Sequence, residues 1–211
     1  PDGLPVVVPH LLGFAPVDSL VVLGLSSPHE DQRRVRVTLR VDLPDPQLPV
    51  SPALQMWSGS FDALSRAGAS SAIVAVYPGA AEDPWRDGLD LRLPRRDLVD
   101  DILTDLDDRG ISVVDALCVV QHRFRSYLCE NLRCCPREGR LVDATEAVRL
   151  TAEFVGLGSC PLPSRDDLAA CLQPTDADRA LAAAVAGEMA DGALTSPSHV
   201  VAAVSGVVAD V

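Results

Sequence analysis

Lysine is missing from this sequence of 211 residues. All 18 basic residues are therefore arginines, and 30 aspartates and glutamates outnumber them, which gives a formal net charge of −12 at pH 7. A strongly acidic surface repels the phosphate backbone of nucleic acids and the anionic headgroups of membranes. A chain without lysine also lacks the Gly-Lys-Ser/Thr end of a Walker A loop. We therefore expect no nucleic-acid partner, no membrane partner and no nucleotide-binding loop of the standard kinds.

Long apolar runs are also missing. No segment reaches the roughly 20 apolar residues that span a bilayer, and the first residues lack the pattern of a signal peptide. The six cysteines then belong to a compartment that keeps thiols reduced. We expect a soluble, cytoplasmic protein. Because the sequence starts without Met and is still apolar at residues 207–211, we expect the parent chain to continue past Val211.

Complete catalytic motifs are absent as well. Ser19 follows Asp18, but no Gly-x-Ser-x-Gly elbow surrounds it. The loop after Tyr77 leaves the end of an apolar run, where α/β folds often bind ligands, but it contains no Gly-x-Gly-x-x-Gly. The sequence thus favours a domain without a recognisable catalytic constellation, and whether it is an enzyme stays open.

Apolar residues make up 47% of the chain, enough for a sizeable core. Period-2 or continuous apolar patterns predict five strands, at residues 19–25, 33–42, 72–77, 112–120 and 123–128. Helical spacing predicts helices from Ser51 to Gly68 and from Arg96 to Arg109. The order ββαβαββ predicts an α/β fold with a mixed, mostly buried sheet of about five strands flanked by helices. The first two strands should be antiparallel, and the strand–helix–strand units should have parallel strands.

The last third of the chain is predicted to be helical. Asp143 with Glu146 and Thr175 with Asp178 are typical of helix starts. A short helix should lie between Ser164 and Pro174, a short helical turn at 9–13, and a last helix at 200–208. We expect an α/β sheet core at 1–142 and C-terminal helices at 143–211, packed on or beside the core or forming one domain with it.

Several short blocks resemble a known family. They are Leu11 to Val22, Arg40 to Pro44, Arg123 with Ser126 to Cys129, Cys134 to Pro136 with Glu138 and Gly139, and Pro163 to Arg165 before Leu168. In this order and spacing they are similar to the actinobacterial domain-of-unknown-function family 4192. The resemblance implies a fold and a lineage, and it implies no activity, cofactor or partner.

Three cysteines gather in one short stretch, Cys129, Cys134 and Cys135, with His122 seven residues earlier. Thiolates and imidazole are zinc ligands, although this spacing differs from the usual pair of Cys-x2–4-Cys knuckles. Two alternatives stay open: a disulfide from Cys129 to Cys134 or Cys135, or free thiols packed under the loop. His122 is also the nearby base that a nucleophilic cysteine would need. Of the other cysteines, Cys118 and Cys171 are predicted to be core residues.

Arginines line two predicted strand faces: Arg34, Arg36 and Arg40 on one, Arg123 and Arg125 on the other. Guanidinium groups suit carboxylates or phosphates. The alternative is ordinary ion pairing between a basic strand face and the aspartate-rich helix 96–109.

Asp18, Arg40 and Asp42 should meet at the sheet edge if the first two strands pair. There they would form either an Arg–Asp pair that fixes the strand end or part of a ligand pocket. We expect an uncharacterised binding or interaction domain whose apolar terminal helices favour a homo-oligomer. The alternatives are a small-molecule enzyme with an Arg/Asp-lined pocket and a redox- or zinc-responsive module built on the cysteine loop.

Overall fold

A computed structural model describes residues 2–26, 34–47, 49–85 and 92–190 of the chain. The chain divides into two compact units, Pro1–Arg165 and Asp166–Val211. The predicted helix at 200–208, and with it the expected self-association through the terminal helices, lies outside the described residues. None of the helices in the described part is long and apolar enough to cross a membrane.

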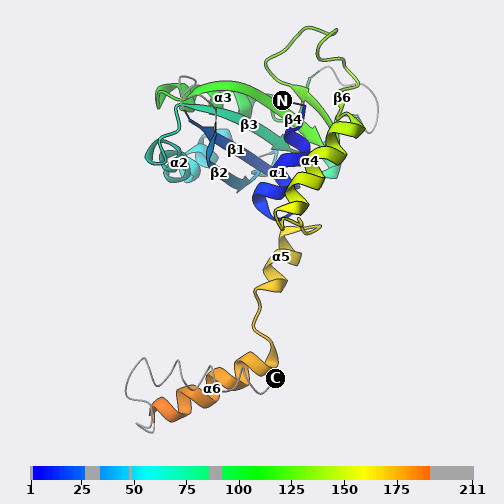
Figure 1. Cartoon of the computed structure of the whole chain (residues 1–211). Coiled ribbons are helices and arrows are strands. Elements are labelled where there is room, and N and C mark those ends of the chain that lie inside the picture. The colour runs from blue at the N-terminus through cyan, green and yellow to red at the C-terminus, as the bar shows by residue number, and fades with distance from the viewer. Residues whose placement is uncertain (1, 27–33, 48, 86–91, 191–211) are drawn as a thin grey trace. The chain divides into compact units, whose positions relative to one another are not determined.

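The first unit is built on a mixed sheet (Figure 1). Its described strands are β1 (Ser19–Leu25), β2 (Val35–Asp42), β3 (Ser71–Tyr77), β4 (Ser112–Val120), β5 (Arg123–Ser126) and β6 (Arg140–Leu141), in the spatial order β2-β1-β3-β4-β5-β6. The β3–β4 pair is parallel and the other neighbours are antiparallel. The predicted α/β class and the antiparallel first pair are confirmed. The short strand β6 was not predicted, because two residues carry no readable period.

The helices of this unit are α1 (Leu4–Leu12), α2 (Val50–Arg66), the 3-10 helix η1 (Ala80–Glu82), α3 (Arg96–Asp108) and α4 (Ala144–Gly156). The prediction of a short turn starting at Pro9 was wrong, because α1 begins at Leu4 and Pro9 lies inside it. Gly13 ends α1 in the left-handed region at φ 80°, a conformation that glycine adopts without steric cost.

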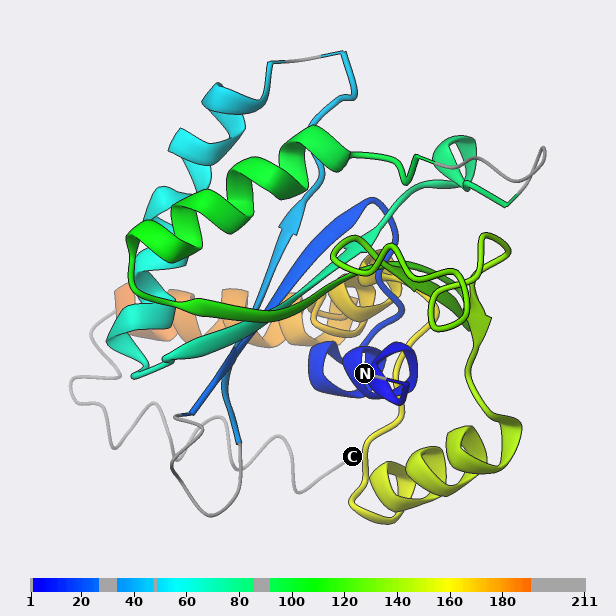
Figure 2. The same cartoon turned by 90° about the horizontal axis from the view of Figure 1, so that it is seen from above.

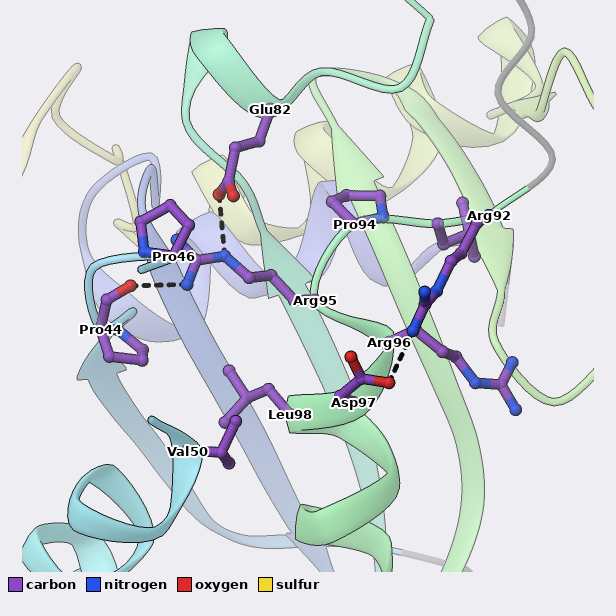
Figure 3. A pocket seen from close by; sticks show the side chains of 11 residues that line it. Pro44, Pro46, Val50, Glu82, Arg92, Pro94, Arg95, Arg96, Asp97 and Leu98 are labelled. Atoms are coloured by element: carbon purple, nitrogen blue, oxygen red, sulfur yellow. Dashed lines mark hydrogen bonds and ion pairs between the residues drawn. The ribbon is translucent and has the colours of Figure 1, made fainter. Parts of the chain in front are cut away.

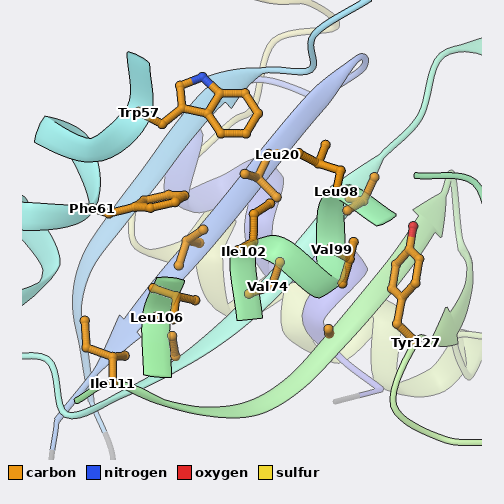
Figure 4. Packing of buried hydrophobic residues seen from close by; sticks show 14 of the residues in the cluster. Leu20, Trp57, Phe61, Val74, Leu98, Val99, Ile102, Leu106, Ile111 and Tyr127 are labelled. Atoms are coloured by element: carbon orange, nitrogen blue, oxygen red, sulfur yellow. The ribbon is translucent and has the colours of Figure 1, made fainter. Parts of the chain in front are cut away.

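Helices α2 and α3 cover one face of the sheet. Trp57 and Phe61 of α2 and Ile102 and Leu106 of α3 point into a cluster that includes Val74 of β3 (Figure 4). The chain passes from β2 through α2 to β3 across the intervening β1. The predicted parallel direction of β2 and β3 therefore holds, although the two strands are not neighbours.

Helix α1 covers the opposite face, with α4 beside it, so the unit has three layers (Figure 2). The His10 ring of α1 stacks on Phe154 of α4, with ring centroids 4.6 Å apart. The chain after α4 then returns to α1: His10 Nδ1 lies 3.0 Å from Ser159 Oγ, and Phe14 forms a parallel bridge with Leu162. These contacts hold residues 13–15, the start of the connection into β1, against the chain that follows α4.

The second unit contains most of α5 (Arg165–Cys171) and α6 (Asp176–Ala190). The predicted start of α6 is confirmed by a reciprocal cap. The Thr175 backbone N–H donates to Asp178 Oδ2 at 2.7 Å, and the Asp178 N–H donates to Thr175 Oγ1 at 3.1 Å. Each bond satisfies a donor that helix formation leaves unpaired.

Candidate functional site

The cysteine-rich segment is the loop 127–139 between β5 and β6. Its first residue, Tyr127, is buried under the N-terminus of α3. The Tyr127 N–H donates to the Ala116 carbonyl at 2.7 Å, and its hydroxyl donates to the Pro94 carbonyl at 2.7 Å. Arg96 donates to the Tyr127 carbonyl at 2.6 Å. The loop therefore leaves the sheet from a fixed point.

Asn131 turns the loop back on itself. Its side-chain oxygen accepts the Arg133 N–H at 3.0 Å, the local bond of an Asx turn. Its carbonyl accepts the N–H groups of Cys134 at 3.0 Å and of Cys135 at 2.7 Å. This turn brings Cys134 and Cys135 back to Cys129, and the three Sγ atoms all lie within 4.8 Å of one another.

The three thiols differ in environment. Cys135 is buried, Cys129 is half-buried and Cys134 is exposed. A hydrogen bond from the Cys135 thiol, with one from the Asn131 backbone, lowers the pKa of Cys129. Burial and the same thiol pair raise the pKa of Cys135 to about 11. Cys129 is therefore the thiol of this pair that ionises first.

The donor set suits a thiophilic metal ion. Zinc binds thiolates at about 2.3 Å, so sulfurs around a tetrahedral zinc lie about 3.8 Å apart. The observed upper limit of 4.8 Å is close to that spacing, and rotation about Cα–Cβ bonds covers the difference. Three thiolates leave the fourth tetrahedral position for water or another ligand. Soft sulfur donors also select Cu(I) and exclude magnesium and calcium.

His122 does not join the three cysteines. It lies at the β4–β5 turn, where its carbonyl accepts the Val142 N–H at 3.0 Å. Cys129 lies past the other end of β5, whose four extended residues alone cover about 13 Å, and the described cluster does not include His122. The predicted fourth ligand, which was also the predicted base for a cysteine nucleophile, is therefore not part of the cluster.

The two cysteines predicted as core residues differ in outcome. Cys118 of β4 is buried next to Tyr127, as predicted. Cys171 is exposed, so the prediction of a core position was wrong. The six cysteines are all free thiols in the structure.

Arg40 and Asp42 form an ion pair of 2.6 Å at the end of β2. Arg40 also donates to Ser19 Oγ at 2.9 Å and lies over the Phe14 ring, while the Asp18 carbonyl accepts the Leu43 N–H at 2.8 Å. Arg40 thus joins the end of β2 to Ser19 at the start of β1.

The predicted ion pairing between the β2 arginines and helix α3 is wrong. Val37, Leu39 and Val41 pack on the cluster beneath α2 and α3. Since neighbouring residues of a strand point to opposite faces, Arg36 and Arg40 project from the other side of the sheet. The aspartates of α3 pair instead with local arginines, in Arg96–Asp100, Arg109–Asp105 and Arg92–Asp97.

Arg123 and Arg125 lie on β5, four strand positions from β2, which corresponds to about 19 Å. They therefore do not form one pocket with Arg40. The Arg123 guanidinium lies 5.9 Å from the Trp85 ring centre and donates to the Glu138 carbonyl. Arg125 is buried and lines a cavity of about 350 Å³ together with Arg92, Arg96 and Cys129.

A second arginine-lined pocket of about 310 Å³ lies at the N-terminus of α3 (Figure 3). Arg95 crosses it, pairing with Glu82 at 2.9 Å and donating to the Pro44 carbonyl at 2.6 Å. Arg92 at its other end pairs with Asp97 at 2.6 Å. These guanidinium groups join separate chain segments, which is a structural role.

Trp85 is a site residue that the sequence analysis missed. Its Nε1 donates to the Arg137 carbonyl at 3.0 Å, and its ring packs on Arg123 and on Gly139, which has φ +71°. Trp85 thereby holds the far end of the cysteine loop. A single tryptophan in a Gly- and Pro-rich loop gives no periodic signal, and only its rarity in this chain marks it.

The comparisons with known proteins place the chain in a family. The model of the domain of unknown function DUF4192 matches residues 1–209, and the chain belongs to this family. Neither the search of curated proteins nor the search of solved structures found a match.

Proposed function

We propose that this DUF4192 domain binds one thiophilic metal ion, zinc in the first place, through Cys129, Cys134 and Cys135. The observation that carries the proposal is the convergence of the three Sγ atoms to within 4.8 Å. Three unprotected thiols this close together oxidise easily to a disulfide, so such a cluster is a liability for a protein whose thiols must stay reduced. A bound ion would hold the three sulfurs as thiolates and protect them.

The ion would also fix the loop. Between Tyr127 and Gly139 the described hydrogen bonds are few: three involve Asn131, and one runs from the Gly139 N–H to the Pro136 carbonyl. By binding Cys129, Cys134 and Cys135 at once, the ion would close a loop that contains no described strand or helix. The function of the domain would then be to bind a metal ion, and the ion would hold the loop in one fixed shape.

Metal analysis tests the proposal. The full chain is purified without chelator, and zinc is counted by mass spectrometry before and after titration against a chromophoric chelator. We expect about one ion per chain. Cys129→Ser and Cys134→Ser should each lower the affinity by at least tenfold. Cys171→Ser, an exposed cysteine of the second unit, is the matched control and should bind as the wild type does. A wild type that takes up no zinc, or equal uptake in all four proteins, contradicts the proposal.

The same proximity supports a second candidate, a reversible disulfide from Cys129 to Cys134 or Cys135. The sulfurs lie within 4.8 Å, and a disulfide needs about 2.0 Å. Thiol counting after mild oxidation separates the two candidates. A redox pair loses two thiols and regains them with dithiothreitol, and it does so whether or not zinc is present. A zinc site resists the oxidant when loaded and becomes sensitive only after the ion is removed.

A further inference from the structure

The cavity of about 350 Å³ beside the cysteine cluster is lined mainly by positive charge. Its walls come from the start of α3 with the residues before it, and from β5 with the chain that follows it as far as Glu130. Among the described residues, three arginines line it, Arg92, Arg96 and Arg125, against the single carboxylate of Glu130. The chain as a whole carries a formal net charge of −12 at pH 7, so this local excess of positive charge needs an explanation.

Arg96 is held at this cavity with one end of its guanidinium group unused. Its Nη1 donates to the Tyr127 carbonyl at 2.6 Å, which fixes the group at the wall that Tyr127 contributes. Its Nε donates to the Asp100 carboxylate at 3.1 Å. No described residue accepts a hydrogen bond from Nη2, and 37% of the side chain is exposed. Nη2 therefore keeps its N–H donors for a ligand, on a side chain whose orientation is already fixed.

Arg125 contributes a buried charge to the same cavity. It lies on β5, in register with Cys118 of β4, and only 9% of its surface is exposed. A guanidinium group keeps its positive charge throughout the pH range in which proteins are folded. Water screens a buried charge less than an exposed one, so Arg125 attracts an anion in the cavity more strongly than an arginine on the surface would.

The carboxylates around the cavity oppose an anion only weakly. Glu130 is exposed. Asp97 and Asp100, which pair with Arg92 and Arg96, have side chains that are 80% and 48% exposed. Ion pairs as exposed as these contribute little free energy, so a ligand can compete for the same arginines.

The other polar groups of the lining narrow the class of ligand. The Ser126 hydroxyl donates to Asp115 at 2.6 Å, and the Tyr127 hydroxyl donates to the Pro94 carbonyl at 2.7 Å. Both hydroxyl donors are thus engaged, and the guanidinium groups are the donors left for a ligand. The planar fork of a guanidinium group matches the paired oxygens of a phosphate or a carboxylate.

We propose that this cavity is a second site, which binds a small molecule through a phosphate or carboxylate group. Arg96 donates hydrogen bonds from Nη2 to the oxygens of that group, and Arg125 supplies a buried positive charge. The volume of the cavity lies within the range of sites for small molecules. The site goes beyond the proposed metal binding and needs no bound ion.

Three aromatic probes test the requirement for charge: phenyl phosphate, benzoate and the uncharged benzamide, which carry different groups on the same ring. The full chain is reduced, freed of metal with a chelator so that no probe binds to an ion, and kept at about pH 6.5, where free thiols are protonated. Saturation-transfer NMR should show saturable binding of phenyl phosphate or benzoate, and the tighter of the two identifies the preferred group. Benzamide should bind at least about tenfold more weakly, because hydrogen bonds to charged groups are the stronger ones. Equal binding of benzamide, or no saturable binding of either anion, would overturn the proposal.

Arginine variants locate the binding. Arg96→Gln and Arg125→Met should each weaken the tighter anion by at least about tenfold. Arg149→Gln is the matched control, because it removes the same charge from an exposed position on α4 that does not line the cavity, and it should bind as the wild type does. Circular dichroism verifies that each variant is folded, and if Arg125→Met is not, Arg96→Gln decides alone. Wild-type affinity in Arg96→Gln, or an equal loss in Arg149→Gln, contradicts the site.

Discussion

The carbonyl of Asn131 accepts the N–H of Cys135 at 2.7 Å, and this bond returns the buried thiol to Cys129. Cys129 and Cys135 are six positions apart in the sequence, and no strand or helix joins them. The turn at Asn131 is thus the local reason that three sulfurs meet, and it makes the proposed metal site sensitive to a residue that carries no ligand.

Asn131→Ala should therefore weaken zinc binding, although it leaves all three cysteines in place. It removes the acceptor of the Arg133 N–H, and one hydrogen bond of this kind contributes about 1 kcal/mol, or roughly fivefold in affinity. Asn131→Asp keeps the acceptor oxygen and should bind as the wild type does. The measurement is the chelator competition described above. Equal affinity in Asn131→Ala would show that the cysteines converge without the turn.

Gly139→Ala should destabilise the first unit by about 1–3 kcal/mol. Gly139 has φ +71°, and a Cβ there would lie 2.7 Å from the Trp85 ring. Gly158→Ala is the matched control, because Gly158 has φ +85° and nothing within 4 Å of the added atom. Urea unfolding of both variants separates backbone strain from the clash. If Gly139→Ala is no less stable than Gly158→Ala, Trp85 yields freely and does not clamp the loop.

Most of the sheet could be predicted from the sequence because its strands are local signals. Ser19–Leu25 and Ser71–Tyr77 are continuous apolar runs, and Val35–Asp42 alternates because Val37, Leu39 and Val41 pack on the cluster beneath α2 and α3. Helix α1 was shortened in the prediction because Pro9 is usually a start signal, whereas here it lies inside the helix. Val6 and Val8 are buried, and this tertiary burial stabilises the helix on the N-terminal side of Pro9.

The sites were harder to predict because they depend on which residues meet in space, and distance along the sequence does not reveal that. Cys129, Cys134 and Cys135 were marked by their chemistry, but His122 was grouped with them by sequence distance alone, and an extended strand separates the two.

The thiols of the loop should differ in reactivity. The pKa of Cys129 is lowered by its hydrogen bonds, and that of Cys135 is raised to about 11. Because the thiolate is the nucleophile, iodoacetamide should modify Cys129 well before Cys135 at pH 8, in metal-free protein. Peptide mass spectrometry at timed intervals measures both. In Cys135→Ala the hydrogen bond to Cys129 is lost, so Cys129 should react more slowly at that pH. Equal rates at the two cysteines of the wild type would contradict the pairing.

Alkaline pH should destabilise the fold through the buried Cys118. Burial raises its pKa to about 12, whereas an unfolded thiol has a pKa of about 8.5. Its contribution to stability is therefore complete below about pH 8.5 and is lost as the pH rises toward 12, at about 1.4 kcal/mol per pH unit. Urea unfolding of the reduced protein between pH 8 and 11 measures the slope.

Cys118→Ala should be less stable at pH 7 and lose stability less steeply above pH 9. Cys171→Ala, at an exposed thiol, should keep the wild-type slope. Buried Tyr77 and Tyr127, whose pKa values are also raised, add to the loss only above about pH 10. The interval from pH 8.5 to 10 thus excludes the tyrosines but includes Cys135, whose pKa is raised to about 11. An unchanged slope in Cys118→Ala within that interval would rule out Cys118 as a contributor.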